Sequence, residues 1–152
     1  MHTIFHRKVV RGVSLIESVV TLGVVVLLIT GLVVGMTLSL QNAQASKARS
    51  LAIQYAQEAL ELVRQERDTN WATFASRDTT GIRTDYCMGS SGQLSTVTGG
   101  SCPPFTGTFS RMVTFTRNLI DPGQMDVAVS VSWIEGSTTK NVALKTKYTD
   151  WK

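Results

Sequence analysis

The longest pattern in the chain is an apolar run near its N-terminus. Residues 11–36 read RGVSLIESVVTLGVVVLLITGLVVGM, and after Arg11 the only charged side chain in this run is Glu17. A helix over residues 18–36 would rise roughly 28 Å, close to the ~30 Å hydrocarbon core of a bilayer. The run therefore predicts a membrane-spanning helix with a single carboxylate at its edge, where desolvation is costly unless the charge finds a partner.

The helical pattern continues beyond the apolar run with a different periodicity. Residues 39–46 are polar without proline, and residues 47–67 (KARSLAIQYAQEALELVRQER) are built from strong helix formers. Apolar side chains recur there at spacings of three and four, which places them on one stripe of a helix: Leu51, Tyr55, Ala56, Ala59, Leu60 and Val63. The charged side chains fall mostly on another face: Glu58, Glu61, Arg64 and Arg67. We expect the helix to end at residues 68–70 and Trp71 to anchor the next segment in a core.

After Pro103 and Pro104 the pattern changes to the alternation that is typical of half-buried strands. Three alternating sets follow: Phe109, Val113 and Phe115; Val127, Val129, Val131 and Trp133; Val142, Leu144, Thr146 and Tyr148. Residues 135–140 (EGSTTK) predict a turn, and so a hairpin, between the last two. The helical stripe would cover the apolar face of this sheet. The sequence thus predicts an α+β fold in which a long N-terminal helix packs on a small antiparallel sheet.

The length of the chain and the distribution of its charges predict how it is organised. The 152 residues leave room for one modest domain beside the membrane segment. We expect a leader at residues 1–12, a transmembrane half-helix at 13–40, an amphipathic half-helix at 41–67 and a globular sheet domain at 68–152. Three of the 15 basic residues and none of the 11 acidic residues lie in the leader, so the remaining chain carries a net charge of +1. This balance gives no support to a nucleic-acid partner, whereas the basic leader predicts that the residues after the helix cross the membrane.

A cleaved secretory signal is the main alternative for this N-terminus. Such signals have an apolar region of about 7–15 residues followed by a cleavage site of small residues. Here the apolar run is longer and the plausible cleavage site precedes it, so we expect the helix to stay attached. A snorkelling Glu17 at the end of an ordinary signal anchor is a further alternative.

Residues 12–17 (GVSLIE), followed by the apolar run, resemble the N-terminal processing motif of type IV prepilins and type II secretion pseudopilins. In that family a membrane peptidase removes a short basic leader after the glycine, and the new N-terminus is methylated. The resemblance implies cleavage between Gly12 and Val13, which makes Glu17 the fifth residue of the mature chain. The family usually has phenylalanine after the cleavage site, and Val13 departs from that. Residues 56–71 also look like the helix exit of some minor-pilin-like proteins.

The resemblance implies a pilin-like fold and a structural role in a type IV pilus or pseudopilus. In a filament the Glu17 carboxylate would meet the α-ammonium of Val13 on a neighbouring subunit, so that opposite buried charges compensate. The implied partners are other pilin or pseudopilin subunits, the prepilin peptidase and membrane lipid. The implied location is the inner (cytoplasmic) membrane, spanned once with the C-terminal domain outside, and then a periplasmic or extracellular filament. The small domain favours a minor subunit.

Cys87 and Cys102 are the two cysteines, and both follow the predicted membrane helix. In an extracytoplasmic compartment such an isolated pair is expected to form a disulfide, here around a loop rich in Gly, Ser and Thr. Two thiols without further ligands do not make a structural zinc site, and their spacing differs from a Cys-x-x-Cys redox pair.

The sequence contains no recognisable catalytic constellation. Both histidines, His2 and His6, lie in the predicted leader, which excludes a Ser-His-Asp arrangement in the mature chain. Residues 89–92 (GSSG) follow no predicted strand, so we do not interpret them as a phosphate-binding loop. Asp121 and Asp126 are candidate calcium ligands, with solvated turn residues as the alternative. We expect no enzymatic activity, no metal and no cofactor.

Two other classes of protein stay open. A minor pilin at an adhesive or DNA-uptake tip would need an exposed basic or aromatic patch. The candidates for that patch, which an ordinary solvated surface explains equally well, are Arg77, Arg83, Lys140, Lys145 and Lys147. A monomeric, signal-anchored extracytoplasmic protein or enzyme would keep Met1 on its mature chain.

Overall fold

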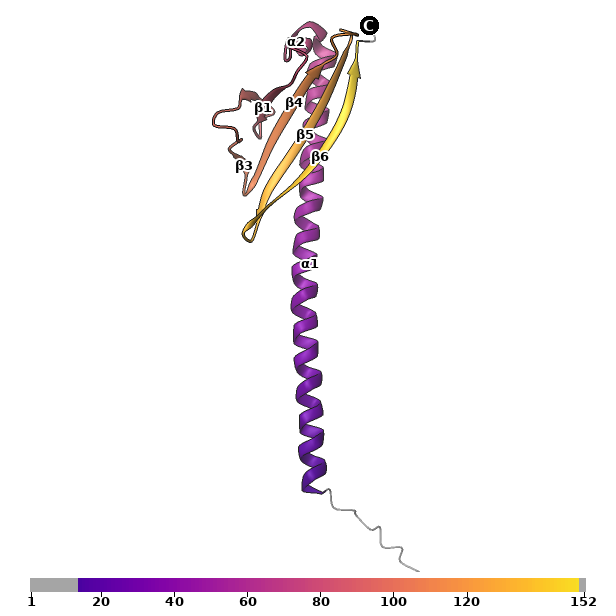
Figure 1. The fold of residues 1–152 in the computed structure, drawn as a ribbon, viewed down its shortest axis with the longest axis vertical. Helices are drawn as coiled ribbons and strands as arrows, with labels where there is room; N and C mark the ends of the chain where they lie inside the picture. Colours follow the sequence, from indigo (N-terminus) through magenta and orange to yellow (C-terminus); the bar gives the residue numbers. More distant parts are fainter. Residues whose placement is uncertain (1–13, 151–152) are drawn as a thin grey trace, which may run out of the picture. The chain divides into compact units, whose positions relative to one another are not determined.

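The structure is a computed structural model that describes residues 14–150. The chain divides into two units, Met1–Ala43 and Gln44–Lys152, and α1 contributes to both. The helices are α1 (Leu15–Thr69) and α2 (Trp71–Ala75). The strands are β1 (Thr84–Met88), β2 (Leu94–Thr96), β3 (Pro104–Thr106), β4 (Phe109–Arg117), β5 (Gln124–Glu135) and β6 (Thr138–Thr149) (Figure 1).

Helix α1 is continuous over 55 residues, as the two helical patterns in the sequence predict. Among the described residues it is the one helix that is long and apolar enough to cross a membrane. The mean hydropathy of its most apolar segment is 2.7, and no residue of that segment is buried within the chain. Signal sequences and core helices can share this length and composition.

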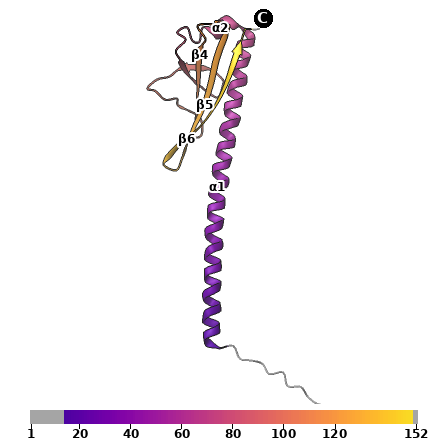
Figure 2. The same cartoon turned by 45° about the vertical axis from the view of Figure 1, so that its right-hand side comes forward.

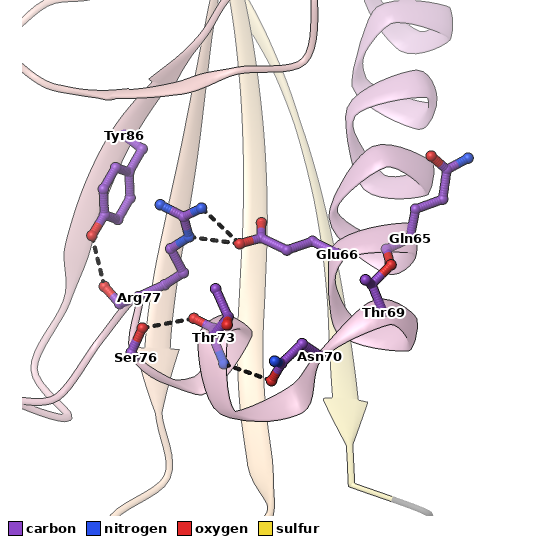
Figure 3. A network of polar contacts seen from close by, with 8 residues as sticks. All are labelled: Gln65, Glu66, Thr69, Asn70, Thr73, Ser76, Arg77 and Tyr86. Atoms are coloured by element: carbon purple, nitrogen blue, oxygen red, sulfur yellow. Dashed lines mark hydrogen bonds and ion pairs between the residues drawn. The ribbon is translucent and has the colours of Figure 1, made fainter.

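The end of α1 is a sharp corner held by local hydrogen bonds (Figure 3). Asn70 has an extended backbone, and its side-chain oxygen accepts a hydrogen bond from the backbone N–H of Thr73 at 3.1 Å, which caps α2. Ser76 Oγ donates to the carbonyl of Thr73 at 2.7 Å, and Arg77 pairs with Glu66 of α1 at 2.7 Å. The predicted helix end at residues 68–70 is therefore confirmed.

Helix α2 serves mainly to bring aromatic side chains into the core. Phe74 is fully buried and makes edge contacts with Phe115 and Tyr148, at ring-centroid distances of 5.8 and 5.6 Å. Trp71 is partly buried and packs beside Phe74, at 5.3 Å between ring centroids. The expectation that Trp71 anchors this segment is confirmed, with Phe74 as the more deeply buried anchor.

The six strands form one antiparallel sheet in the order β2-β1-β4-β5-β6, and β3 pairs with the start of β4. Figure 2 shows the long strands β4, β5 and β6 of this sheet. The three predicted strands correspond to β4, β5 and β6. Strands β1, β2 and β3 were not predicted, because each is at most five residues long and too short for a clear alternation. Residues 89–92 do follow a strand, contrary to the prediction. They connect β1 to β2, so no helix follows them and a phosphate-binding loop is still not formed.

The hairpin between β5 and β6 is tighter than the sequence suggests. The two strands stay in register up to the pair Glu135 and Thr138, which leaves only Gly136 and Ser137 in the loop. Gly136 adopts a φ of +62°, a conformation that glycine allows without strain. The prediction of a turn over residues 135–140 is therefore wrong in its extent, since residues 138–140 are extended and paired.

In the second unit, α1 buries a stripe of small side chains against the sheet: Ala52, Ala56, Ala59 and Val63. They pack with the inward-facing residues of β4, β5 and β6, among them Val113, Phe115, Val127, Val129, Val131, Trp133 and Tyr148. The predicted helix stripe and strand faces are thus confirmed, although Ala52 rather than Leu51 lies at the centre. Arg67 does not belong to the exposed face: it donates to the carbonyl of Thr149 and lies over the Tyr148 ring.

Arg111 is a charged residue in the middle of this core, with no exposed surface. Its guanidinium donates to the carbonyls of Gly89 at 2.7 Å and Tyr55 at 3.1 Å, and it lies 3.6 Å from the half-exposed Glu58 carboxylate. Burial lowers the pKa of Arg111, and Glu58 opposes this shift, so the side chain stays charged. One cation therefore ties β4 to α1 and to the turn between β1 and β2.

We expect the substitution Arg111→Met to lower the free energy of unfolding by about 2–3 kcal/mol, because buried carbonyls lose a charged donor. Urea unfolding of the full chain in detergent, followed by tryptophan fluorescence, measures this. The matched control is Arg64→Met, since Arg64 pairs with Glu61 on the exposed surface and should change stability by less than about 1 kcal/mol. Equal stability of the two variants would contradict the structural role of Arg111.

Candidate functional site

The first candidate site is the apolar part of α1 with its single carboxylate. Glu17 lies in the first turn of the helix and is the only ionisable residue between positions 15 and 46. The neighbouring apolar side chains are largely exposed in the isolated chain, for example Leu15 at 83% and Ile16 at 71%. Within the described residues, Glu17 forms no ion pair. The segment therefore presents an apolar surface with one unpaired anion.

The three threonine hydroxyl groups of the same segment differ from Glu17, because the helix itself satisfies them. Thr21, Thr30 and Thr37 each donate to the carbonyl four residues earlier, at 2.8, 2.8 and 2.9 Å. Such back-bonding lets a threonine lie in an apolar medium without an external partner. The carboxylate of Glu17 has no comparable donor in its own helix, so it is the charged side chain of this segment that has no partner among residues 14–150.

The predicted cleavage site, Gly12 and Val13, lies outside the described residues. Its proximity to Glu17 therefore rests on the sequence, in which Val13 precedes Glu17 by four positions.

The predicted disulfide between Cys87 and Cys102 is present, with 5.3 Å between the two Cα atoms. It joins β1 to the segment directly before β3. A crosslink that closes a loop of this length removes about 3 kcal/mol of conformational freedom from the unfolded chain in the entropy model. The bond therefore fixes the course of a Gly- and Ser-rich loop along one side of the sheet.

The five basic residues considered for a nucleic-acid or adhesive patch do not gather in one place. Three of them have carboxylate partners, in the pairs Arg77–Glu66, Arg83–Asp85 and Lys147–Asp126. Arg83, Lys145 and Lys147 line a shallow hollow together with Asp126, whereas Lys140 lines a different one beside α1. Arg77 follows α2 and pairs with Glu66 of α1. Because three of these residues are already paired and the five are separated, the structure gives little support to one anionic ligand that all five would bind.

The two aspartates considered for calcium have other contacts. Asp121 accepts hydrogen bonds from the backbone N–H of Gly123 and from the side chain of Gln124, both within its own turn. Asp126 pairs with Lys147 at 3.7 Å on the exposed face of the sheet. Among residues 14–150 no group of three or more acidic, cysteine or histidine side chains is placed to hold a metal ion.

Asp78 is a buried carboxylate that the sequence analysis missed. One of its oxygens accepts from the backbone N–H of Thr80 at 2.9 Å, the Thr80 hydroxyl at 2.7 Å and the Thr84 hydroxyl at 3.1 Å. The other accepts from the backbone N–H of Arg117 at 2.9 Å. Burial by itself would raise the pKa of Asp78, but these hydrogen bonds outweigh it and hold the pKa below its ordinary value.

Asp78 therefore joins the loop before β1 to the end of β4. The residues DTTG at positions 78–81 are typical of a turn, which was a usable signal for the local hydrogen bonds. The contact with Arg117, 39 positions later, has no signal in the sequence. For Arg111, the usable signal was a charged residue at an inward-facing position of an otherwise apolar alternation.

We expect Asp78→Asn to lower the free energy of unfolding by about 2–3 kcal/mol at neutral pH, because buried donors lose an ionised acceptor. The folded-state pKa is lowered, so the stability that this carboxylate contributes is present above about pH 4 and is lost as the pH falls through the folded-state value. The difference between the two proteins should therefore shrink below pH 4.

Unfolding in urea at a series of pH values measures this difference. The control is Asp126→Asn, which removes an exposed ion pair and should change the stability by less than about 1 kcal/mol at neutral pH. A stability loss in Asp78→Asn that stayed constant down to pH 2 would contradict the role given to the ionised carboxylate.

No family model matches the chain, and no curated protein or solved structure matches it either. A functional conclusion for this chain therefore draws on its own residues: the GVSLIE motif, the apolar helix with Glu17 and the disulfide-bonded sheet unit.

Proposed function

We propose that the chain is a structural subunit of a type IV pilus or a related pseudopilus. In this proposal a prepilin peptidase cleaves it after Gly12, the new N-terminus at Val13 is methylated, and subunits assemble through the N-terminal helix. Before assembly the subunit is anchored in the cytoplasmic membrane by residues 13–40. The sheet unit lies outside the membrane, where the disulfide is stable.

The observation that carries the proposal is the unpaired carboxylate of Glu17 on an exposed apolar helix. A lone anion in an apolar medium costs several kcal/mol, so it needs a cation, and residues 14–150 offer none there. Cleavage after Gly12 would create such a cation, the α-ammonium of Val13. A methylated amine keeps its positive charge, so it can still pair with the Glu17 carboxylate of a neighbouring subunit.

The sheet unit supports a structural rather than an enzymatic role. Its buried polar side chains hold the fold together: Arg111 contacts backbone carbonyls, and Asp78 contacts backbone and hydroxyl donors. Both side chains are engaged in hydrogen bonds within the fold, so neither is placed to act on a bound molecule. A DNA-uptake or adhesive tip gains no comparable support, since three of the five candidate basic residues are paired.

The first test is the processing step. In the wild type we expect a mature N-terminus at methylated Val13, read by mass spectrometry of the membrane-extracted protein. Gly12→Leu should leave the leader attached, because a bulky residue replaces the glycine at the cleavage site. Gly31→Ala is the control: it changes a glycine within the apolar helix, where a Cβ has open space, and should be cleaved normally. A wild-type chain that starts at any other residue would contradict the proposal.

The second test is the charge pairing. Glu17→Gln keeps the size of the side chain and removes its charge, so we expect normal cleavage and a loss of at least about tenfold in filaments recovered by shearing. The control is Thr30→Val, which makes the same helix more apolar without touching the carboxylate. Wild-type filament yield from Glu17→Gln would show that the proposed ion pair is not needed for assembly.

A further inference from the structure

One end of the sheet carries an apolar tip, which we define as Ile82, Leu119 and Ile120. These side chains are 81%, 65% and 96% exposed. Ile82 belongs to the loop before β1, and the other two to the loop between β4 and β5. The two loops touch, because a Cβ added to Gly81 would collide with the side chain of Leu119. The three exposed apolar side chains therefore belong to two loops that meet at this end of the sheet.

The tip is held rigidly by hydrogen bonds. The side-chain oxygen of Asn118 accepts from the backbone N–H groups of Ile120 and Asp121, at 3.0 and 3.2 Å. The backbone N–H of Asn118 donates to the carbonyl of Gln124 at 3.1 Å, which closes the loop. Asp78 fixes the other loop to the end of β4, as described above. An isoleucine that is 96% exposed is thus presented on a loop whose backbone is held by hydrogen bonds.

The other end of the sheet has a hollow of about 440 Å³, which we call the outer hollow. Its floor includes Ser110, Met112, Ser132 and Ile134, which alternate with buried residues and so lie on the face opposite to α1. Its wall includes Cys102 and Pro104, which the disulfide and the pairing of β3 with β4 hold in place. No charged side chain lines it.

The tip and the outer hollow cannot meet within one chain. Ser110 lies at the start of β4 and Leu119 follows its end, a separation of roughly 25 Å along the strand. Figure 1 and Figure 2 show this directly: the turn between β5 and β6 lies at one end of the sheet, and α2 lies at the other. A projecting apolar group and an uncharged hollow at opposite ends of one sheet can meet only between two copies.

We propose that the apolar tip of one copy inserts Ile120 into the outer hollow of a second copy. The two surfaces differ, so the contact is heterologous, and each copy that binds leaves one free tip and one free hollow. Repetition therefore gives an open row of subunits along the strand direction. This contact rests on the proposed function, because it names a second interface, between sheet units, for the same filament that the N-terminal helices would build.

Photocrosslinking in the full, membrane-anchored chain tests the contact. The variant Ile120→p-benzoylphenylalanine places the reactive group at the tip, and Thr96→p-benzoylphenylalanine, at the exposed edge of β2, is the matched control. After irradiation of cells we expect adducts from position 120 that map by mass spectrometry to residues 102–112 or 132–139 of another copy. The control should give none there. Position-120 adducts only with lipid, with other proteins or with a different part of the chain would overturn the proposal.

A second test of the contact fills the outer hollow with a larger side chain. Ser132→Trp, combined with the reactive group at position 120, should lower the yield of those adducts by about tenfold or more. Ile120→Asp should lower filament recovery with unchanged urea unfolding, whereas Thr96→Asp should leave both unchanged. Wild-type recovery of filaments from Ile120→Asp would overturn the contact.

These results are separable from the failure of the proposed function. If the wild type forms filaments that depend on Glu17 but position 120 gives no adduct in the hollow, the contact is wrong and the proposed function stands. If no filaments form, the proposed function fails. Adducts between the tip and the hollow in the membrane fraction would then still support the contact, and their absence would overturn it.

Discussion

The second unit depends on the burial of one narrow stripe of α1 beneath the sheet. The central side chains of the stripe are Ala52, Ala56, Ala59 and Val63, which are small enough to bring the helix backbone close to β4, β5 and β6. Larger side chains flank them, and Phe74 from α2 closes the end of the core. Because this face is fully used for folding, the helix has one surface for the sheet and, in its apolar half, a separate exposed surface.

Two buried charged side chains, Arg111 and Asp78, hold loops that the apolar core does not reach. Arg111 ties the turn between β1 and β2 to the helix, and Asp78 ties the loop before β1 to the end of β4. Each makes several hydrogen bonds to groups that are far apart in the sequence, which offsets the cost of desolvating a charge. The turn between β1 and β2 and the loop before β1 are therefore held in place. The loop before β1 carries Ile82, and it meets the loop that carries Leu119 and Ile120.

The proposed assembly assigns a different kind of interaction to each unit. In the apolar helix a single charge, Glu17, would be compensated by a cation of a neighbouring subunit, so electrostatics would set the register. In the sheet unit the proposed contact is apolar and depends on shape, through the tip and the outer hollow. The disulfide contributes by holding Cys102 at the wall of that hollow. A subunit held to its neighbours by both proposed interfaces would be bound more tightly than a subunit held by one of them.

The sequence by itself determined the elements whose periodicity is long: α1, the stripe near residues 51–63, β4 to β6 and the helix end at residues 68–70. It also indicated the disulfide, because the chain has two cysteines, both after the apolar run, and neither has another cysteine with which to pair. Hydrophobic periodicity is a local property, so a linear pattern is enough for these features. Glu17 was identified in the same way, as one charge in an apolar run, whereas its cation and the cleavage at Gly12 remain predictions.

Only the tertiary structure decided the features that join distant segments. Strands β1, β2 and β3 are too short to show a period. In the folded chain β1 and β3 pair with β4, and β2 pairs with β1. The contacts of Asp78 with Arg117 and of Arg111 with Tyr55 span 39 and 56 positions, a separation at which one sequence carries no signal. The apolar tip and the outer hollow likewise exist only after folding, because each is built from residues that the sheet brings together from separate loops and strands.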